Sequence, residues 1–141
     1  MTQAEAGTVR AAEEDIREWL AYAEADRQSA HNALQMADYR DAAFHCQQAI
    51  EKLLKTVIVA ETGQRPPYVH DLRALLRRIR QIAIPEELAR DISDMDIYYT
   101  GTRYPGVLDP EMLTPERISL LVAQMEEVFQ WFLRKINFES T

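Results

Sequence analysis

The stretch FHCQQAIEKLLK, residues 44–55, decides the fold because it sets polar side chains directly beside an apolar helical stripe. Four polar residues of this stretch occupy positions i, i+3, i+4 and i+7, which places them on one side of an α-helix. They are Gln48, Glu51, Lys52 and Lys55. This polar strip adjoins the apolar stripe instead of lying opposite it. The pattern predicts a helix that is packed into a larger helical assembly, with polar groups at the edge of its buried face.

The polar strip has two interpretations, which the sequence leaves open. In the first, Gln48 and Glu51 hydrogen-bond to neighbouring helix ends, while Lys52 and Lys55 lay their aliphatic stems along apolar surface and extend their ammonium groups into water. In the second, the strip lines a polar pocket, and Lys55 holds a phosphate there with Gln48 and Glu51 as supporting hydrogen-bonding groups.

On both sides of this stretch, apolar residues recur at helical spacing along most of the chain. Only four glycines occur, and no alternating β-branched run of useful length is present. Helices are predicted over about residues 9–36, 40–61, 70–82, 86–99 and 115–136. Asp38 and Thr114 are the predicted N-caps, Gly63 ends the second helix, and Pro66-Pro67 lie in a loop. The expected fold is all-α, an up-and-down bundle of four to five antiparallel helices.

Length and charge restrict the function. The 141 residues with 47% hydrophobic content predict a single domain, 1–141. A net charge of −7 argues against general binding of duplex nucleic acid, although residues 64–82 carry five arginines and one aspartate and form a local basic patch. The lone Cys46, the lack of a signal segment and the lack of an 18-residue apolar run predict a cytoplasmic protein that does not enter membranes.

Three short motifs then follow one another in a recognisable order. A Tyr-x-x-Ala-Ala-Phe lead-in precedes the opening stretch, a His-Asp-Leu sequence follows the proline loop, and an Arg-Tyr-Pro sequence comes last. In this order and at this spacing they resemble the HEPN domain family, over roughly residues 15–135. The first motif is Gln47 to Lys55 with its lead-in Tyr39 to Phe44, the second is His70-Asp71-Leu72, and the third is Arg103-Tyr104-Pro105.

This resemblance implies a bundle of four or five helices that commonly pairs into a homodimer. In prokaryotes, such domains are often encoded beside a minimal nucleotidyltransferase, as a toxin and antitoxin or a related defence pair. Many members are metal-independent ribonucleases. Others lack the catalytic motif and are thought to bind nucleotides or to serve as partner proteins.

The ribonuclease members carry an arginine followed after four to six residues by a histidine, late in the domain. Arg103 is the late candidate here, and no histidine follows it. Arg40 and His45 match the pattern early in the chain, but about one such match is expected by chance. A five-residue step within one helix also turns the two side chains to different faces. We therefore predict no catalytic residues, and keep a ribonuclease toxin acting through Arg40 and His45 as the alternative.

Two further segments carry candidate binding residues. His70 begins a predicted helix whose free backbone N–H groups could hold an anion, with Arg73 and Arg77 one and two turns on; alternatively, His70 or Asp71 merely caps the helix. In the loop after the predicted helix 86–99, Arg103 and Tyr104 combine a guanidinium with an aromatic face on which a base could stack. The structural alternative has Tyr98 in the core, Arg103 bonded to a helix C-terminus and Tyr104 covering the end of the bundle.

These observations combine into one hypothesis. Lys55, His70, Arg103 and Tyr104, supported by Gln48 and Glu51, are predicted to meet at one end of the bundle and to bind the phosphates of a nucleotide. No metal site is predicted, because the three histidines and one cysteine are far apart in the sequence, and no cofactor is expected. The predicted partners are a second copy of the chain and a nucleotidyltransferase protein, with RNA as a ligand only under the ribonuclease alternative.

Overall fold

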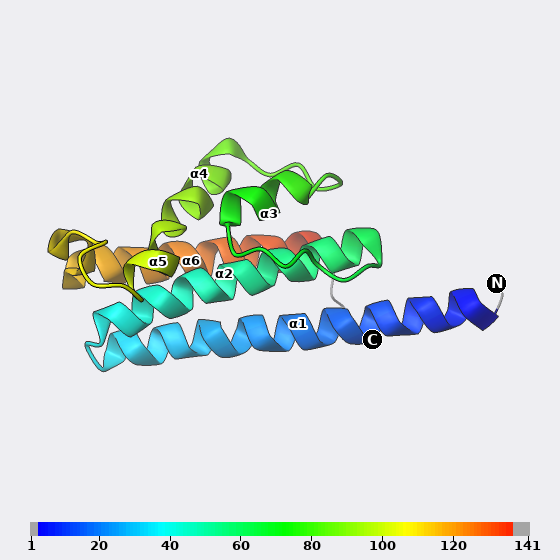
Figure 1. The fold of residues 1–141 in the computed structure, drawn as a ribbon, viewed down its shortest axis with the longest axis horizontal. Helices are drawn as coiled ribbons and strands as arrows, with labels where there is room; N and C mark the ends of the chain where they lie inside the picture. The colour runs from blue at the N-terminus through cyan, green and yellow to red at the C-terminus, as the bar shows by residue number, and fades with distance from the viewer. Residues whose placement is uncertain (1–2, 137–141) are drawn as a thin grey trace.

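The computed structural model describes the backbone of residues 3–136 and the side chains of residues 13–136, and within this range all regular structure is helical (Figure 1). This confirms the predicted all-α class. The elements are α1 (Gln3–Gln35), α2 (Tyr39–Thr62), α3 (Leu72–Arg78), α4 (Glu86–Met95), α5 (Ile97–Gly101), the 3-10 helix η1 (Pro110–Leu113) and α6 (Pro115–Ile136).

The two longest helices, α1 and α2, form an antiparallel hairpin (Figure 1). Its tight connection places Ala37 at a positive φ of 58°. Asp38 caps α2 as predicted, because its side chain accepts a hydrogen bond from the Asp41 N–H at 3.3 Å. Gly63 ends α2 in the left-handed conformation, which is inexpensive only for glycine, and donates its N–H to Val59 at 2.8 Å.

The third long helix, α6, lies beside α2 and runs antiparallel to α1, because α3, α4 and α5 return the chain to the end of the molecule where α2 begins (Figure 1). The apolar faces of α1, α2 and α6 meet the inner sides of the short helices in a single core. Its largest fully buried side chains include Phe129, Phe132, Ile50, Leu53, Leu72 and Ile92. Cys46 is also buried there, and burial raises the pKa of its thiol, so it behaves as a small hydrophobe.

The middle of the chain differs from the prediction. Helix α3 ends at Arg78, and the buried Ile79 lies beyond it, because the Arg80 and Gln81 N–H groups donate to the Glu61 carboxylate at the end of α2. The helix predicted over residues 86–99 is divided at Asp96 into α4 and α5. Both changes depend on contacts between elements, which helical periodicity does not report.

In the described part of the chain, none of the helices combines the length and the apolar character that crossing a lipid bilayer requires.

Candidate functional site

A buried carboxylate occupies the centre of the polar strip on α2. Glu51 accepts hydrogen bonds from Lys55 Nζ at 3.1 Å and from His70 Nδ1 at 3.1 and 3.2 Å. The side chains of Glu51 and Lys55 are only 4% and 6% exposed. The first interpretation of the strip is therefore wrong for Lys55, whose ammonium group stays inside and lies 5.4 Å from the centre of the Trp19 ring. We call Lys55, Glu51 and His70 the His70 network.

Two glutamines on α2 extend this network. Gln48 Nε2 donates to Gln47 Oε1 at 2.7 Å and, more weakly, to Glu51 at 3.5 Å. Gln47 Nε2 in turn donates to the carbonyl oxygen of His70 at 3.4 Å. Gln47 is fully buried and thus links the segment carrying His70 to α2. It was not among the predicted binding residues. Gln48 lies one turn before Glu51 on α2.

Carboxylates already occupy the backbone N–H groups at the start of α3. Asp71 accepts from the N–H groups of Arg73 and Ala74 at 2.9 and 3.3 Å, and Asp96 accepts from that of Leu72 at 3.1 Å. The capping alternative is confirmed, with Asp71 as the cap. The N–H groups of Leu72, Arg73 and Ala74 are therefore already bonded to carboxylates of the protein.

Asp71 and Asp96 also influence each other's ionisation. Burial raises the pKa of Asp96 to about 6, and the neighbouring Asp71 carboxylate adds to the rise. The contact with Asp96 lowers the pKa of Asp71. When the pair holds a single proton, Asp96 therefore carries it, and this proton is lost as the pH rises through about 6.

Tyr99 on α5 connects His70 to the Arg-Tyr-Pro loop. The rings of His70 and Tyr99 are stacked, with their centroids 4.7 Å apart and an angle of 16° between their planes. The Arg103 guanidinium carbon lies 4.9 Å from the centre of the Tyr99 ring. Lys55, His70 and Arg103, which are far apart in the sequence, are thus joined through Glu51 and Tyr99.

The other loop residues divide between core and surface. Tyr98 is buried and its hydroxyl donates to the Met112 carbonyl at 3.1 Å, as its structural alternative predicted. The arginine bonded to the end of α5 is Arg40, not Arg103; its Nη1 donates to the Thr102 carbonyl at 3.2 Å and reaches that of Gly101 at 3.5 Å. Tyr104 is 56% exposed and leaves its ring available for stacking.

The outer end of the His70 network is open to solvent. The His70 side chain is 45% exposed, and the neighbouring Tyr68 is 97% exposed, with its ring centroid 6.2 Å from that of His70. We call the exposed groups of Tyr68, His70, Arg103 and Tyr104 the rim: Tyr68 lies next to His70, Arg103 is linked to His70 through Tyr99, and Tyr104 follows Arg103 in the chain. The rim combines an imidazole and a guanidinium, which bind phosphate oxygens, with two free aromatic faces, which stack on bases.

His45, on α2, belongs to a second network. Asp26 on α1 lies 2.8 Å from His45 Nδ1 and is also bonded to Lys52 Nζ; we call these residues the His45 network. His45 therefore faces α1, while Arg40 lies against the end of α5. The early match to the ribonuclease pattern does not form a pair of side chains directed at one point.

The remaining histidine, His31, is bound in the same manner. Its Nε2 lies 2.8 Å from Glu126 on α6, and Arg27 forms two hydrogen bonds, of 2.6 and 2.8 Å, with the same carboxylate; this is the His31 network. The Arg27 bonds hold the pKa of Glu126 at about 2. Each histidine is thus bonded to a carboxylate that also binds a cation.

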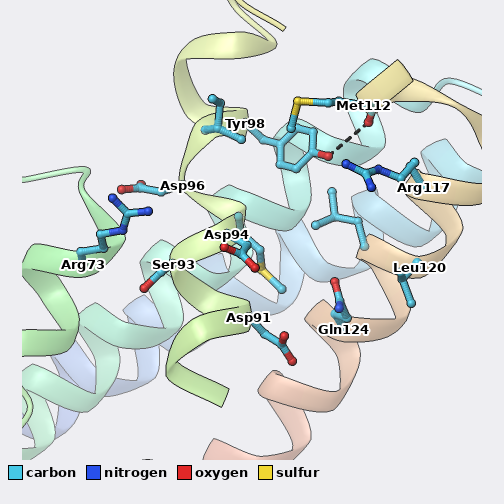
Figure 2. A pocket seen from close by; sticks show the side chains of 13 residues that line it. Arg73, Asp91, Ser93, Asp94, Asp96, Tyr98, Met112, Arg117, Leu120 and Gln124 are labelled. Carbon is cyan, nitrogen blue, oxygen red and sulfur yellow. Dashed lines mark hydrogen bonds between the residues drawn. The ribbon is translucent and has the colours of Figure 1, made fainter. Parts of the chain in front are cut away.

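A cavity of about 640 Å³ lies elsewhere, between α4 and α5 on one side and α6 on the other. Figure 2 shows Asp91 and Asp94 on one wall and Arg117 and Gln124 on the other. Burial raises the pKa of Asp91, and nearby carboxylates reinforce the rise. Arg73, which was considered for the anion site at the start of α3, lines this cavity, but Lys55, His70, Arg103, Tyr104, Gln48 and Glu51 do not. The sequence contained no sign of it, because it forms where the expected single helix divides at Asp96.

The part of the chain that the structure describes contains no cluster of three histidine, cysteine, aspartate or glutamate residues that could hold a metal ion.

Comparison with known proteins adds independent information. The model of the HEPN domain matches residues 16–136. The solved structure of TT1696 from Thermus thermophilus superposes with a TM-score of 0.76 at 25% identity, over 86% of this chain and 97% of that one. ST0689, described as an archaeal HEPN homologue, superposes with a TM-score of 0.69 at 22% identity over the same shares, which indicates a shared fold. Among curated proteins, none matches significantly.

The bundle of α1, α2 and α6 with three short helices across it therefore defines an all-α domain of a known architecture. The chain belongs to the HEPN domain family.

Proposed function

We propose that this chain is a non-catalytic HEPN module that binds a nucleotide at the rim, acts in the cytoplasm as a homodimer, and works with a minimal nucleotidyltransferase in a toxin–antitoxin or defence-type pair. The observation that supports nucleotide binding is the continuous contact from buried Glu51 through His70 and Tyr99 to Arg103. Such support from within holds the exposed imidazole and guanidinium in fixed positions before a ligand arrives.

The proposal assigns different roles to the residues. His70 and Arg103 contact the phosphates, and Tyr104 or Tyr68 stacks on the base, because these groups are exposed. Lys55 and Glu51 are buried and bonded to each other, so they support His70 without touching the ligand. Gln48 supports Glu51 in turn.

Calorimetric titration with ATP and GTP tests the binding half. We expect Arg103→Ala to weaken binding at least about tenfold, as the loss of a charge-assisted phosphate contact does. Arg90→Ala is the matched control, because it removes the same charge from an exposed residue of α4. Absence of heat and of thermal stabilisation by either nucleotide, or equal weakening in both variants, contradicts the assignment.

The partner half is tested separately. If a neighbouring gene encodes a minimal nucleotidyltransferase, co-expression should give a complex that elutes as one species, and light scattering on this chain alone should give twice the mass of one copy. A monomer, or a nucleotidyltransferase that elutes separately, contradicts this half of the proposal.

The ribonuclease alternative is not favoured, because Arg40 and His45 lie against different elements. A gel assay with defined RNA tests it. Cleavage without added metal that is abolished by both Arg40→Ala and His45→Ala would replace the non-catalytic assignment with a ribonuclease.

A further inference from the structure

The bond between Glu51 and His70 determines which imidazole nitrogen is available at the rim. An ionised carboxylate can only accept hydrogen bonds, so the Nδ1 atom facing Glu51 carries the hydrogen. No residue in the described part of the chain is bonded to His70 Nε2. This nitrogen is therefore a lone-pair acceptor when the ring is neutral and a second donor when the ring is protonated.

The two buried charges of the His70 network, on Lys55 and Glu51, oppose each other. Lys55 and Glu51 are both buried and carry opposite charges, so a neutral His70 leaves the network with no net charge. Protonation adds one positive charge at the surface, and Arg103 carries another over the Tyr99 ring on which His70 stacks. The titratable groups in contact with the His70 ring are Glu51 on α2, Tyr99 on α5 and Tyr68 in its own segment. Around them, Lys55 is bonded to Glu51, Arg103 lies over Tyr99, and Asp71 is the next residue of the chain.

The charges of this arrangement can be compared with those of the two classes of phosphate ester. A protonated imidazole and a guanidinium together carry two positive charges, which match the two negative charges of a phosphate monoester near neutral pH. A phosphodiester carries only one negative charge and offers fewer unshared oxygens. The Glu51 carboxylate also keeps the ring directed outward, since it anchors the inner nitrogen.

We propose that the rim recognises a terminal phosphate monoester, and that His70 takes up a proton from solvent when this group binds, with Glu51 as the residue that positions the imidazole. This inference rests on the proposed nucleotide binding and specifies its ligand class and its chemistry. The proton adds to Nε2, which then donates to a phosphate oxygen, while the bond from Nδ1 to Glu51 is kept.

The His45 network supplies a matched control. His45 is also bonded through Nδ1 to a carboxylate that holds a lysine. Its ring, however, has Phe44 as its aromatic neighbour and no arginine beside it, and it faces α1 instead of the rim. A substitution at His45 removes the same group from an equivalent bonding environment without altering the proposed site.

Calorimetry with adenosine 5′-monophosphate at about pH 7.5, where the phosphate is almost fully dianionic, tests the inference. Titrations in two buffers of different ionisation enthalpy give the number of protons taken up. We expect an uptake approaching one proton for the wild type and for His45→Asn. We expect none for His70→Asn, together with a loss of affinity of about tenfold. Adenosine 3′,5′-cyclic monophosphate, a diester, should bind more weakly and without proton uptake.

Other results contradict the inference in distinguishable ways. Binding of the monophosphate without proton uptake, or uptake that persists in His70→Asn because the phosphate itself is protonated, refutes it and leaves nucleotide binding intact. Absence of binding of adenosine 5′-monophosphate by the wild type refutes the inference, and it refutes nucleotide binding as well when ATP and GTP also fail to bind. Glu51→Gln tests the positioning role, since it keeps the imidazole but should reduce the uptake; circular dichroism verifies its folding, and His70→Asn decides the inference if Glu51→Gln does not fold.

Discussion

The His70 and His45 networks contain the same three groups, an imidazole, a carboxylate and a lysine, yet they distribute them differently between core and surface. In the His70 network the lysine and the carboxylate are buried and the histidine is the most exposed member. In the His45 network the lysine and the histidine share similar partial exposure, 26% and 29%. In the His70 network, two buried charged groups support one exposed imidazole ring. The His45 network instead links the adjacent helices α1 and α2.

This difference has an energetic consequence. A charge that loses its partner in the interior keeps its full desolvation cost, while one at the surface is stabilised by water. The His70 network should therefore be costly to break and the His45 network inexpensive. The following predictions test this comparison.

The largest effect is expected from removing the buried carboxylate. Glu51→Gln leaves Lys55 without its anionic partner and should lower the free energy of unfolding by about 3 kcal/mol. Asp26→Asn removes the anionic partner of the partly exposed Lys52 and should cost about 1 kcal/mol. Urea unfolding of both variants measures the difference. Equal losses would show that the two networks are energetically alike.

A double-mutant cycle sharpens the same point. Lys55→Met alone should be destabilising, but Lys55→Met combined with Glu51→Leu should recover about 2 kcal/mol, because two buried charges are exchanged for apolar contacts. The corresponding cycle on Lys52 and Asp26 should give a coupling energy below about 1 kcal/mol. If the losses in unfolding free energy of the two single variants add up in the double variant, Lys55 and Glu51 do not act as one unit.

The His31 network adds a test by pH. The Arg27 bonds lower the pKa of Glu126 from 4.5 to about 2 in the folded protein. Because the folded value is the lower one, this stabilisation is present above about pH 4.5 and is lost as the pH falls to about 2. Glu126→Gln should remove about 1 kcal/mol of stability at pH 6 and little at pH 2. Thermal melts measure this: if the Tm of the variant falls between pH 6 and pH 2 as steeply as that of the wild type, the prediction is contradicted.

The smallest effect is expected at the carboxylate that anchors the start of α3. Burial raises the pKa of Asp96 from 3.8 to about 6, so its contribution is favourable below about pH 3.8 and is lost as the pH rises through 6. Asp96→Asn keeps an acceptor for the Leu72 N–H and should raise the Tm by about 2 °C at pH 7.5 and by less at pH 4. A lower Tm at pH 7.5 would show that the negative charge itself is needed there.

The sequence predicted those parts of the fold that depend on neighbouring residues. Asp38 and Gly63 were identifiable as the ends of α2 because capping and left-handed glycine geometry are local properties. The end of α3 was not identifiable, since the apolar spacing continues through Ile79. There the chain is held instead by Glu61, a residue 19 positions away from Arg80.

The candidate site shows the same division. The spacing of Glu51 and Lys55 by four residues already placed both side chains on one side of α2. The position of Lys55 inside the protein, the bond from Glu51 to His70, and the stacking of His70 on Tyr99 were not readable, because they require α3 and α5 to lie against α2. The sequence also suggested Arg103 as the arginine at a helix C-terminus, a role that belongs to Arg40.

By itself, the sequence determined the helical class, the helix boundaries set by local caps, and the identity of the polar groups on α2, because these follow from interactions within a few residues. Only the tertiary structure decided which charges are buried and which histidine reaches solvent. Burial and partner choice depend on how distant helices pack, and packing sets the cost of separating each charge from its counterion.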